Sequence, residues 1–390
     1  MFIQLSDAVL HAIRKLNAAG FEAYAVGGCV RDSLMGKVPG DWDVTTSATP
    51  PEMQTVFAAY RTFETGLQHG TLTVLVDDVP LEITTYRVDG DYSDGRHPDA
   101  VCFTRSLAED LCRRDFTINA MAYHPTVGVV DLHGGQADLA AGLIRCVGDP
   151  QIRFREDALR ILRALRFSAM LGFAIEENTA VALDVLSPTL TYVSVERIAA
   201  EFKKLLCGTN AVGVLEKFCN TISVFLPEIC PCSNFSLLDA MKPTPRARLA
   251  ALFHSAHISA NEAQIILRRL RFDNQTVRDV SLLLTDEAAS IADTDASCLR
   301  LLHTFGEELI YDYLSLRLAS DAIVRRVDTL LQAEACYQLS MLSVSGEDVI
   351  RAGVTPGPEV GRMLQTLLEA VMDGECPNQK EALLRHIKKK

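Results

Sequence analysis

Hydrophobic and polar residues follow two periods over residues 1–145. Apolar residues spaced three and four apart predict a helix over 4–19. Short apolar or alternating runs predict strands at 24–26, 41–46, 71–76, 81–86 and 127–132. Further helices are predicted after Ser47-Ala-Thr-Pro-Pro51, where proline suits a first helical turn, and over 115–123. This part of the chain therefore mixes helices and strands around a small sheet.

From Gly148 onward the strand signals nearly vanish. The apolar spacing is helical, with breaks at the prolines of 188, 227–231, 243–245 and 356–358. The predicted fold class is therefore α+β: an N-terminal domain with a small mixed sheet, followed by an all-α remainder. With 390 residues, the chain is long enough for roughly two to four compact units.

Two glycines and two aspartates carry the first chemical signal. Gly27 and Gly28 stand between the first predicted strand and a helix, and Asp41 and Asp43 follow on the next strand. Glycine permits close approach of the backbone to a phosphate, and the N–H groups of a helix start favour anions. Two residues apart on one strand, the carboxylates would project to the same side and require a counter-ion such as Mg²⁺. The pattern predicts a metal–triphosphate site.

Two further segments have more than one interpretation. Glu82 alternates along the predicted strand 81–86 and is either a third active-site carboxylate or an ordinary edge-strand glutamate. Arg113 and Arg114 stand just before the predicted helix 115–123. Their planar, permanently charged donors suit phosphate or ribose oxygens, but a charged helix cap would have the same sequence.

Segment 149–167 is predicted to be one amphipathic helix. Its leucines would pack inward, while charged residues recur every three positions at Asp157, Arg160, Arg163 and Arg166. One turn apart, Asp157 can accept from the exocyclic amine of cytosine or adenine, and Arg160 can donate to the adjacent ring nitrogen. Uracil and guanine lack that amine and would leave the carboxylate unpaired, at a cost of about 1–3 kcal/mol. This segment predicts discrimination among nucleobases.

Charge and cysteine content narrow the class of protein. The net charge of −12 argues against a general polyanion binder but allows nucleic acid to bind at local basic patches. No apolar run approaches the ~18 residues of a membrane helix. Eleven cysteines without a Cys-x-x-Cys pair suit reduced thiols in the cytoplasm better than a disulfide framework or a structural zinc site.

Taken in order, these motifs resemble a known family. Gly-Gly, helix and Asp-x-Asp are similar to the polymerase-β-like nucleotidyltransferases, and the whole chain resembles the class II CCA-adding enzymes. The motifs that carry the resemblance are 27–32, Asp41-Trp-Asp43, Arg113-Arg-Asp115, Glu156-Asp-x-x-Arg160, the helix motif 193–205 and the segment 353–361 with Asn378.

The resemblance implies both activity and site residues. It implies template-independent addition of CCA to the 3′ end of tRNA from CTP and ATP, by two-metal phosphoryl transfer. Mg²⁺ would bind Asp41 and Asp43, the catalytic pair. The implied nucleotide-binding residues are Gly28, Arg31, Arg114, Asp157, Arg160, Arg163 and Arg166.

It also implies the domains and partners. A nucleotidyltransferase head would span 1–147, a helical neck for nucleotide selection 148–207, a helical body 208–325 and a helical tail 326–390. The tail would bind tRNA at its acceptor and T arms, mainly through phosphate and shape. Neither DNA nor a membrane is expected as a partner.

The alternatives are relatives with another product or none. Bacterial poly(A) polymerases share the head motifs but carry an arginine-rich segment where this chain reads 65–74. CC-adding relatives lack the loop that is full length here at 86–98, and others add A alone. No histidine precedes an aspartate, so a His-Asp phosphohydrolase site at His254 and His257 is not expected. An inactive tRNA-binding relative would have lost a carboxylate, whereas Asp41 and Asp43 are both present.

Overall fold

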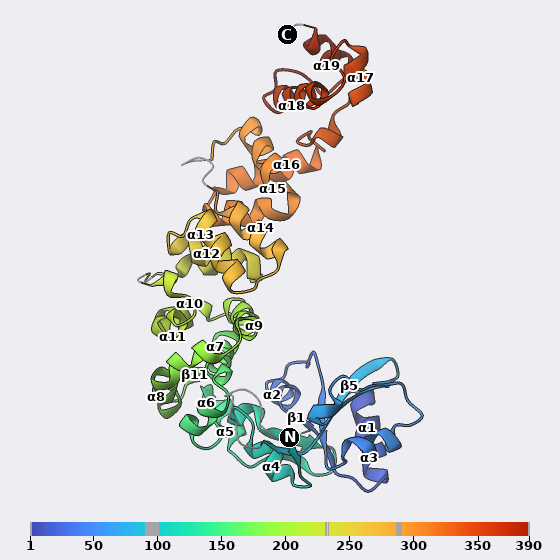
Figure 1. The fold of residues 1–390 in the computed structure, drawn as a ribbon, viewed down its shortest axis with the longest axis vertical. Helices are drawn as coiled ribbons and strands as arrows, with labels where there is room; N and C mark the ends of the chain where they lie inside the picture. Colours follow the sequence, from blue (N-terminus) through green and yellow to red (C-terminus); the bar gives the residue numbers. More distant parts are fainter. Residues whose placement is uncertain (1, 90–100, 231, 233, 286–290, 389–390) are drawn as a thin grey trace. The chain divides into compact units, whose positions relative to one another are not determined.

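The computed structural model describes residues 2–89, 101–230, 232, 234–285 and 291–388. The chain forms two compact units, Met1–Cys230 and Pro231–Lys390. In Figure 1 the first unit runs from blue through green and the second from yellow through red. Most of the predicted loop 86–98 lies outside the described residues.

A mixed sheet organises the first 131 residues, as predicted. Among the described residues its strands lie in the order β3-β4-β5-β2-β1-β8-β9. They are β1 (Ala23–Val26), β2 (Asp43–Thr46), β3 (Thr62–Phe63), β4 (Thr71–Val76), β5 (Val79–Thr85), β8 (Met121–His124) and β9 (Gly128–Asp131). Neighbours are antiparallel except β2 and β5, which are parallel. Shorter pairs join β6 (Arg87–Asp89) to β7 (Val101–Phe103) and β10 (Leu143–Ile144) to β11 (Ala174–Ile175).

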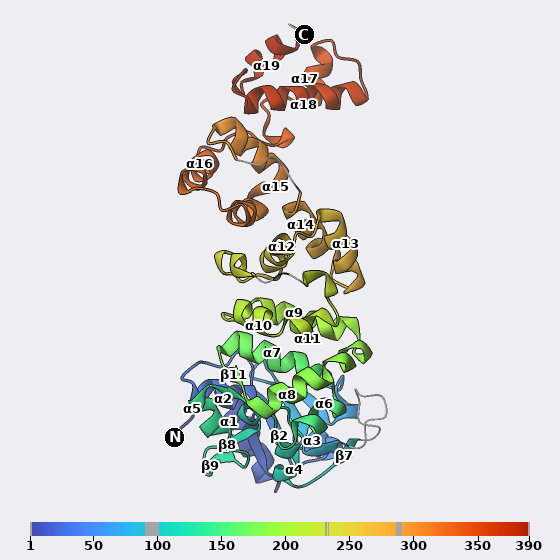
Figure 2. The same cartoon turned by 90° about the vertical axis from the view of Figure 1, so that its left-hand side faces the viewer.

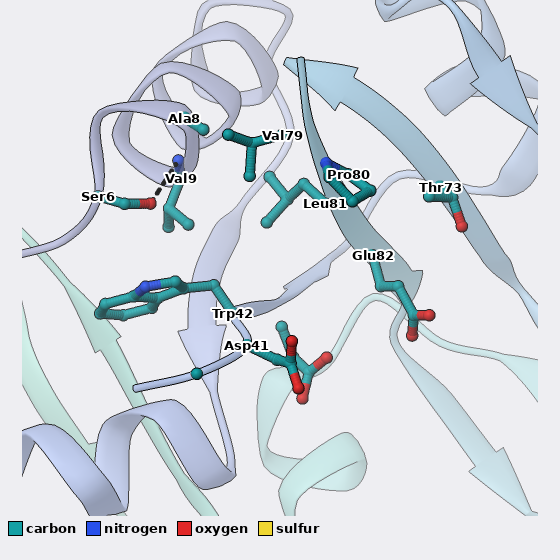
Figure 3. A pocket seen from close by; sticks show the side chains of 12 residues that line it. Ser6, Ala8, Val9, Asp41, Trp42, Thr73, Val79, Pro80, Leu81 and Glu82 are labelled. Atoms are coloured by element: carbon teal, nitrogen blue, oxygen red, sulfur yellow. Dashed lines mark hydrogen bonds between the residues drawn. The ribbon is translucent and has the colours of Figure 1, made fainter. Parts of the chain in front are cut away.

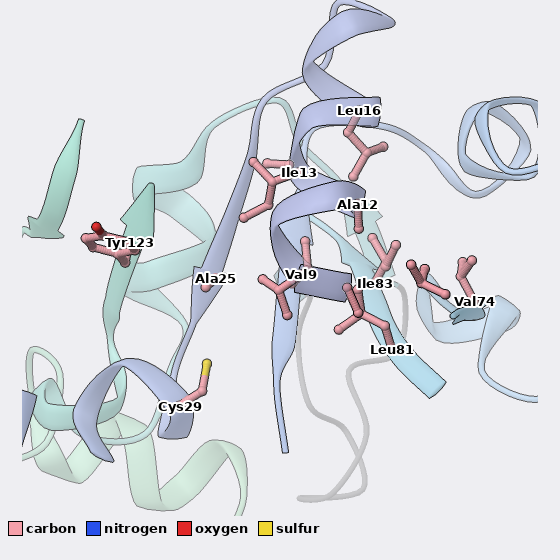
Figure 4. Close-up of a cluster of buried hydrophobic side chains, with 14 of the residues drawn as sticks. Val9, Ala12, Ile13, Leu16, Ala25, Cys29, Val74, Leu81, Ile83 and Tyr123 are labelled. Atoms are coloured by element: carbon pink, nitrogen blue, oxygen red, sulfur yellow. The ribbon is translucent and has the colours of Figure 1, made fainter. Parts of the chain in front are cut away.

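Helix α1 (Asp7–Ala18) covers one face of this sheet. It begins after Ser6, whose side chain accepts from the N–H of Val9, as is common at helix starts. Figure 4 shows Val9 and Ile13 of α1 between β1 and β5, close to Ile83. The three side chains are at most 1% exposed, so this face forms the main core of the sheet domain.

Two sequence predictions in this region differ from the structure, one in where a strand begins and the other in the type of element. The strand predicted over 41–46 begins at Asp43, because β1 ends at Val26 and the chain then turns at Gly27, leaving no partner for Asp41. The predicted helix 115–123 is a 3₁₀ turn, Thr117–Asn119, followed by β8. Pairing of β8 with β1 and β9 decides this, since a short apolar run fits either period.

In the first unit, helices α1 to α4 precede or alternate with the strands of the large sheet, and α5 to α11 follow it. Among the described residues, the helices of this unit are α1, α2 (Gly28–Leu34), α3 (Pro50–Val56), α4 (Leu107–Cys112), α5 (Gly135–Ala141), α6 (Pro150–Glu156), α7 (Leu159–Leu171), α8 (Glu177–Leu186), α9 (Val195–Leu206), α10 (Ala211–Lys217) and α11 (Cys219–Ser223). Figure 2 shows α7 and α9 side by side, and the two helices pack on each other.

A third prediction also differs from the structure. The single helix predicted over 149–167 is two helices, α6 and α7, with a break at Asp157. Asp157 has extended backbone angles, φ −144° and ψ 105°, and its carboxylate accepts from the N–H of Leu159 at 3.0 Å. Such a side-chain bond to the backbone competes with helix continuation. The predicted inward packing holds, because Leu162 and Leu165 of α7 are buried.

The described residues of the second unit form helices only, apart from turns and irregular segments. They are α12 (Pro245–Ser255), α13 (Ala260–Arg269), α14 (Asn274–Leu283), α15 (Asp295–Leu316, kinked at Gly306), α16 (Asp321–Gln332), α17 (Gly346–Arg351), α18 (Pro358–Met372) and α19 (Lys380–Ile387). Pro245 and Pro358 stand in the first turns of their helices, as the predicted breaks require. None of the described helices has the length and hydropathy needed to cross a bilayer.

Candidate active site

The side chain of Arg114 lies against the backbone of the glycine turn. Gly27 joins β1 to α2 with φ of 82°, a conformation that favours glycine. A Cβ atom at Gly27 would lie 3.1 Å from Nη1 of Arg114. Gly28 begins α2, and a Cβ there would lie 3.7 Å from Nη2 of Arg31. The turn thus brings two of the predicted nucleotide-binding arginines against bare backbone.

Three carboxylates lie at the edge of a pocket beside this turn. Asp43 opens β2 and stands opposite Glu82 of β5 in the parallel register. Both line a pocket of about 470 Å³ together with Asp41 and Trp42. Figure 3 shows the Asp41 and Glu82 carboxylates on the side of the pocket away from Trp42. Asp41 reaches it from the bend before the strand, not from the strand itself.

The electrostatics of Asp43 show why this position would take a cation. Burial is the largest effect on the pKa of Asp43, and it raises that pKa. The Arg114 guanidinium lowers the pKa, whereas the Glu82 and Asp41 carboxylates raise it, and the net shift is upward. The ionised form is therefore disfavoured unless positive charge is added. Within the described part of the chain, no three His, Cys, Asp or Glu side chains are grouped to hold one metal ion. A role for Glu82 as a third ligand stays a prediction.

Arg113 and Arg114 are fixed by a carboxylate that the sequence analysis missed. They follow α4, and both pair with Asp110, one turn earlier, at 2.7 and 3.2 Å. Asp110 is fully buried. Burial alone raises its pKa, but the two arginines outweigh burial and the net shift is downward. The available signal was that Asp110 precedes Arg113 and Arg114 by three and four residues. The same spacing, however, is typical of ion pairs on exposed helix faces.

A second network links α2 to α7 through Asp115. Nη1 of Arg31 donates to Oδ1 of Asn119 at 2.6 Å, and Nδ2 of Asn119 donates to Oδ1 of Asp115 at 3.2 Å. The other oxygen of Asp115 pairs with Arg163 at 2.6 Å. Burial raises the pKa of Asp115, but Arg163 and Asn119 outweigh burial and bring it to about 2. Three segments distant in sequence, α2, residues 115–119 and α7, are thereby connected.

Asp115 should stabilise the fold in a pH-dependent manner. Its pKa falls from 3.8 to about 2 on folding, so ionised Asp115 stabilises the protein above pH 4. This contribution, about 2 kcal/mol, disappears as pH falls from about 4 to 2. We expect the difference in unfolding free energy between wild type and Asp115→Asn to be constant from pH 7 to 5 and to narrow below 4. Urea titrations at each pH measure it. A difference that stays constant to pH 2 would contradict this assignment.

The base-reading pair predicted from the sequence has different partners in the structure. Oδ2 of Asp157 accepts from Nη2 of Arg197, which belongs to α9, at 2.8 Å. Arg160 pairs with Glu156 and donates to the carbonyl of Arg113 at 3.1 Å. The backbone N–H of Arg160 donates to the carbonyl of Asp157 at 3.0 Å, so the two residues are neighbours, but the side chain of each is oriented by a residue that was not predicted to do so.

Arg163 and Arg166 gather around one aromatic ring. The guanidinium carbons of Arg31, Arg163 and Arg166 lie 5.2, 5.5 and 4.1 Å from the ring centre of Phe167. Glu201 of α9 pairs with Arg166 at 3.0 Å and lies 3.9 Å from Arg163. The carboxylate of Glu201 therefore offsets the repulsion between the positively charged Arg163 and Arg166. Arg197 and Glu201 are four residues apart in the helix motif 193–205, which was the signal for them.

The predicted site residues thus form two connected groups. Asp41, Asp43 and the glycine turn make the first. Arg31, Asp157, Arg160, Arg163 and Arg166 belong to the second, around α7. Arg114 connects them, because it lies over Gly27, acts on Asp43 and stands next to Asp115 in the chain.

Three family models match successive parts of the chain. The Poly A polymerase head domain matches residues 23–145, the RNA- and SrmB-binding site of polymerase A matches 172–232, and tRNA nucleotidyltransferase domain 2 matches 244–387. Fold, site and these matches together define the class of the protein, which is a nucleotidyltransferase.

Relatives narrow the class further. The CCA-adding enzyme of Enterococcus faecalis is 37% identical over 389 residues, covering 97% of this chain and 94% of that protein. That of Leuconostoc mesenteroides is 38% identical over 391 residues, covering 96% and 94%. The crystal structure of the Bacillus stearothermophilus CCA-adding enzyme in complex with CTP has a TM-score of 0.84 and 32% identity, covering 98% and 96%. The chain belongs to the family of CCA-adding enzymes.

Proposed function

We propose that this protein builds the CCA end of tRNA without a nucleic-acid template, using CTP and ATP and releasing pyrophosphate. The observation that carries the proposal is a series of contacts: Arg114 acts on Asp43, and Asp115, the next residue, pairs with Arg163 of α7, the helix that begins two residues after Asp157. A site for transfer chemistry and a group able to discriminate bases are thus joined within one unit. Family membership supports the same activity.

Asp41 and Asp43 fit a divalent metal. Asp43 is disfavoured as an anion where it stands, beside Asp41 and Glu82, and carboxylate oxygens are the ligands that Mg²⁺ prefers. When bound there, Mg²⁺ would lower the pKa of the tRNA 3′-hydroxyl and balance charge on the triphosphate. Gly27 and Gly28 leave room for phosphate oxygens, and Arg114 and Arg31 supply positive charge beside them.

Nucleotide selection would fall to the residues around α7. Asp157 accepts from the exocyclic amine of cytosine or adenine with the lone pairs that Arg197 and the Leu159 N–H do not occupy. Arg160 would donate to the ring nitrogen after exchanging one of its contacts with the protein. Arg163 and Arg166 would complete the positively charged wall.

The predicted division into parts belongs to this proposal. A head at 1–147 would transfer the nucleotide, a neck at 148–207 would select it, and a body at 208–325 with a tail at 326–390 would hold the acceptor and T arms of tRNA. We place the protein in the cytoplasm, where tRNA is available and its cysteines remain thiols.

The decisive assay supplies Mg²⁺ and tRNA lacking its 3′ end, with CTP, ATP, both, or UTP and GTP. We expect two additions with CTP alone and three with CTP plus ATP, resolved at single-nucleotide resolution. A long A ladder would instead identify a poly(A) polymerase, and an arrest after two additions with both nucleotides a CC-adding enzyme. Binding of tRNA without any product would identify an inactive relative and refute the proposal.

A further inference from the structure

Two thiols far from the site residues in sequence are in contact. Cys219 is the first residue of α11, and Cys230 follows the 3₁₀ turn Pro227–Ile229. Their Sγ atoms are 2.9 Å apart. Sγ of Cys230 also lies 3.9 Å from the carbonyl oxygen of Cys219. All eleven cysteines are thiols in this structure, so the contact joins two reduced side chains.

The geometry needs little change to become a covalent bond. A disulfide has an S–S distance of about 2.05 Å, so the two sulfurs must approach by less than about 1 Å. Helix α11 and the turn Pro227–Ile229 already pack on each other. Both thiols are half-buried, whereas Cys29 and Cys146 of the same unit are buried. A small oxidant can therefore reach the pair, while the surrounding backbone holds the two sulfurs together.

We propose that Cys219 and Cys230 form a redox-sensitive pair that closes to an intramolecular disulfide when the protein meets a peroxide. One thiolate attacks a peroxide oxygen, breaking the O–O bond and giving a sulfenic acid and, with a proton, water. The second thiol attacks the sulfenic sulfur, forming the S–S bond and releasing a second water. Hydrogen peroxide takes up two electrons, and two thiols become one disulfide.

The disulfide would fix the end of the first unit. Cys230 is its last residue, and the bond would tie that residue to α11. None of the predicted site residues lies within 219–230, so the nucleotide site keeps its own groups. In a reducing compartment such a bond is transient and reversible, which suits a response to oxidant rather than a permanent structural link.

The test is a cleavage experiment on the full chain. The reduced protein is treated with hydrogen peroxide, its remaining thiols are alkylated, and tryptic peptide 218–246, which holds Cys219, Cys230 and Cys232, is isolated. We expect this peptide to carry one alkyl group where the reduced peptide carries three, and to be about 2 Da lighter than the reduced peptide once the alkyl groups are subtracted. Cutting after Glu228 separates Cys219 from the other two cysteines, so the two fragments should stay joined until dithiothreitol is added.

Two variants identify the partner. In Cys232→Ser the fragments should still be joined after peroxide treatment, and in Cys230→Ser the link should be lost. Circular dichroism and CTP addition before oxidation verify that each variant is folded. Fragments that separate in the wild type would overturn the proposal. A link lost in Cys232→Ser but kept in Cys230→Ser would assign the disulfide to Cys232 and overturn it equally.

Discussion

Replacing Asp43 by Asn should lower the rate of nucleotide addition by about 10³-fold while leaving the fold at least as stable. An amide cannot replace a carboxylate as ligand to a divalent cation that balances the triphosphate. Burial and the carboxylates of Glu82 and Asp41 raise the pKa of Asp43 despite Arg114. At neutral pH the ionised side chain therefore destabilises the folded protein, and the neutral amide removes that cost.

Single-turnover addition of one C to tRNA lacking its 3′ end measures the rate, and urea unfolding measures stability. Asp77→Asn is the matched control. Asp77 is an exposed carboxylate in the β4–β5 turn with φ of 49°, a conformation that Asn tolerates. It should keep the wild-type rate. A rate for Asp43→Asn within tenfold of wild type, or a loss that parallels unfolding, would contradict the assigned role.

Elements with local signals could be predicted from the sequence. Alternation of apolar residues located β4 at Thr71–Val76, since one face of that strand is buried. The breaks predicted at 243–245 and 356–358 fall at the starts of α12 and α18, because proline fits a first helical turn and little else in a helix. The glycine turn at Gly27 was equally local, because a positive φ beside a charged group admits few other residues.

Elements whose structure depends on tertiary partners could not be predicted from the sequence. The segment 121–124 is a strand because β1 and β9 lie on either side of it, and nothing within the segment says so. Asp157 leaves the helix because its carboxylate accepts hydrogen bonds from the Leu159 N–H and from Arg197, which is forty residues away in the chain.

The candidate site shows the same limit. Local patterns predicted its motif residues, but they did not predict the residues that orient them in the structure. Asp110 and Glu201 lie on helices, where a carboxylate among basic residues is usually part of a solvated face. In the structure both are buried and each holds arginines of the site. Burial, which the sequence pattern did not reveal, separates the two cases.

Replacing Asp157 by Asn should abolish most of the discrimination between CTP and UTP at the first addition. The carboxylate only accepts hydrogen bonds, so it pairs with the amine of cytosine and opposes the O4 oxygen of uracil. An amide of the same shape can present its N–H₂ to that oxygen. We expect the ratio of kcat/KM for CTP over UTP to fall roughly 5- to 150-fold, the equivalent of about 1–3 kcal/mol.

Arg197 provides a graded comparison. Arg197→Gln keeps the carboxylate but removes the charged partner 2.8 Å from it, so the same ratio should fall less than in Asp157→Asn. Lys204→Gln removes a positive charge from an exposed position of the same helix and should leave the ratio unchanged. Because Asp157 also anchors Arg197, a purely structural role would lower kcat/KM for CTP and UTP equally in Asp157→Asn. A constant ratio would therefore assign Asp157 to the joint between α6 and α7 and remove it from base reading.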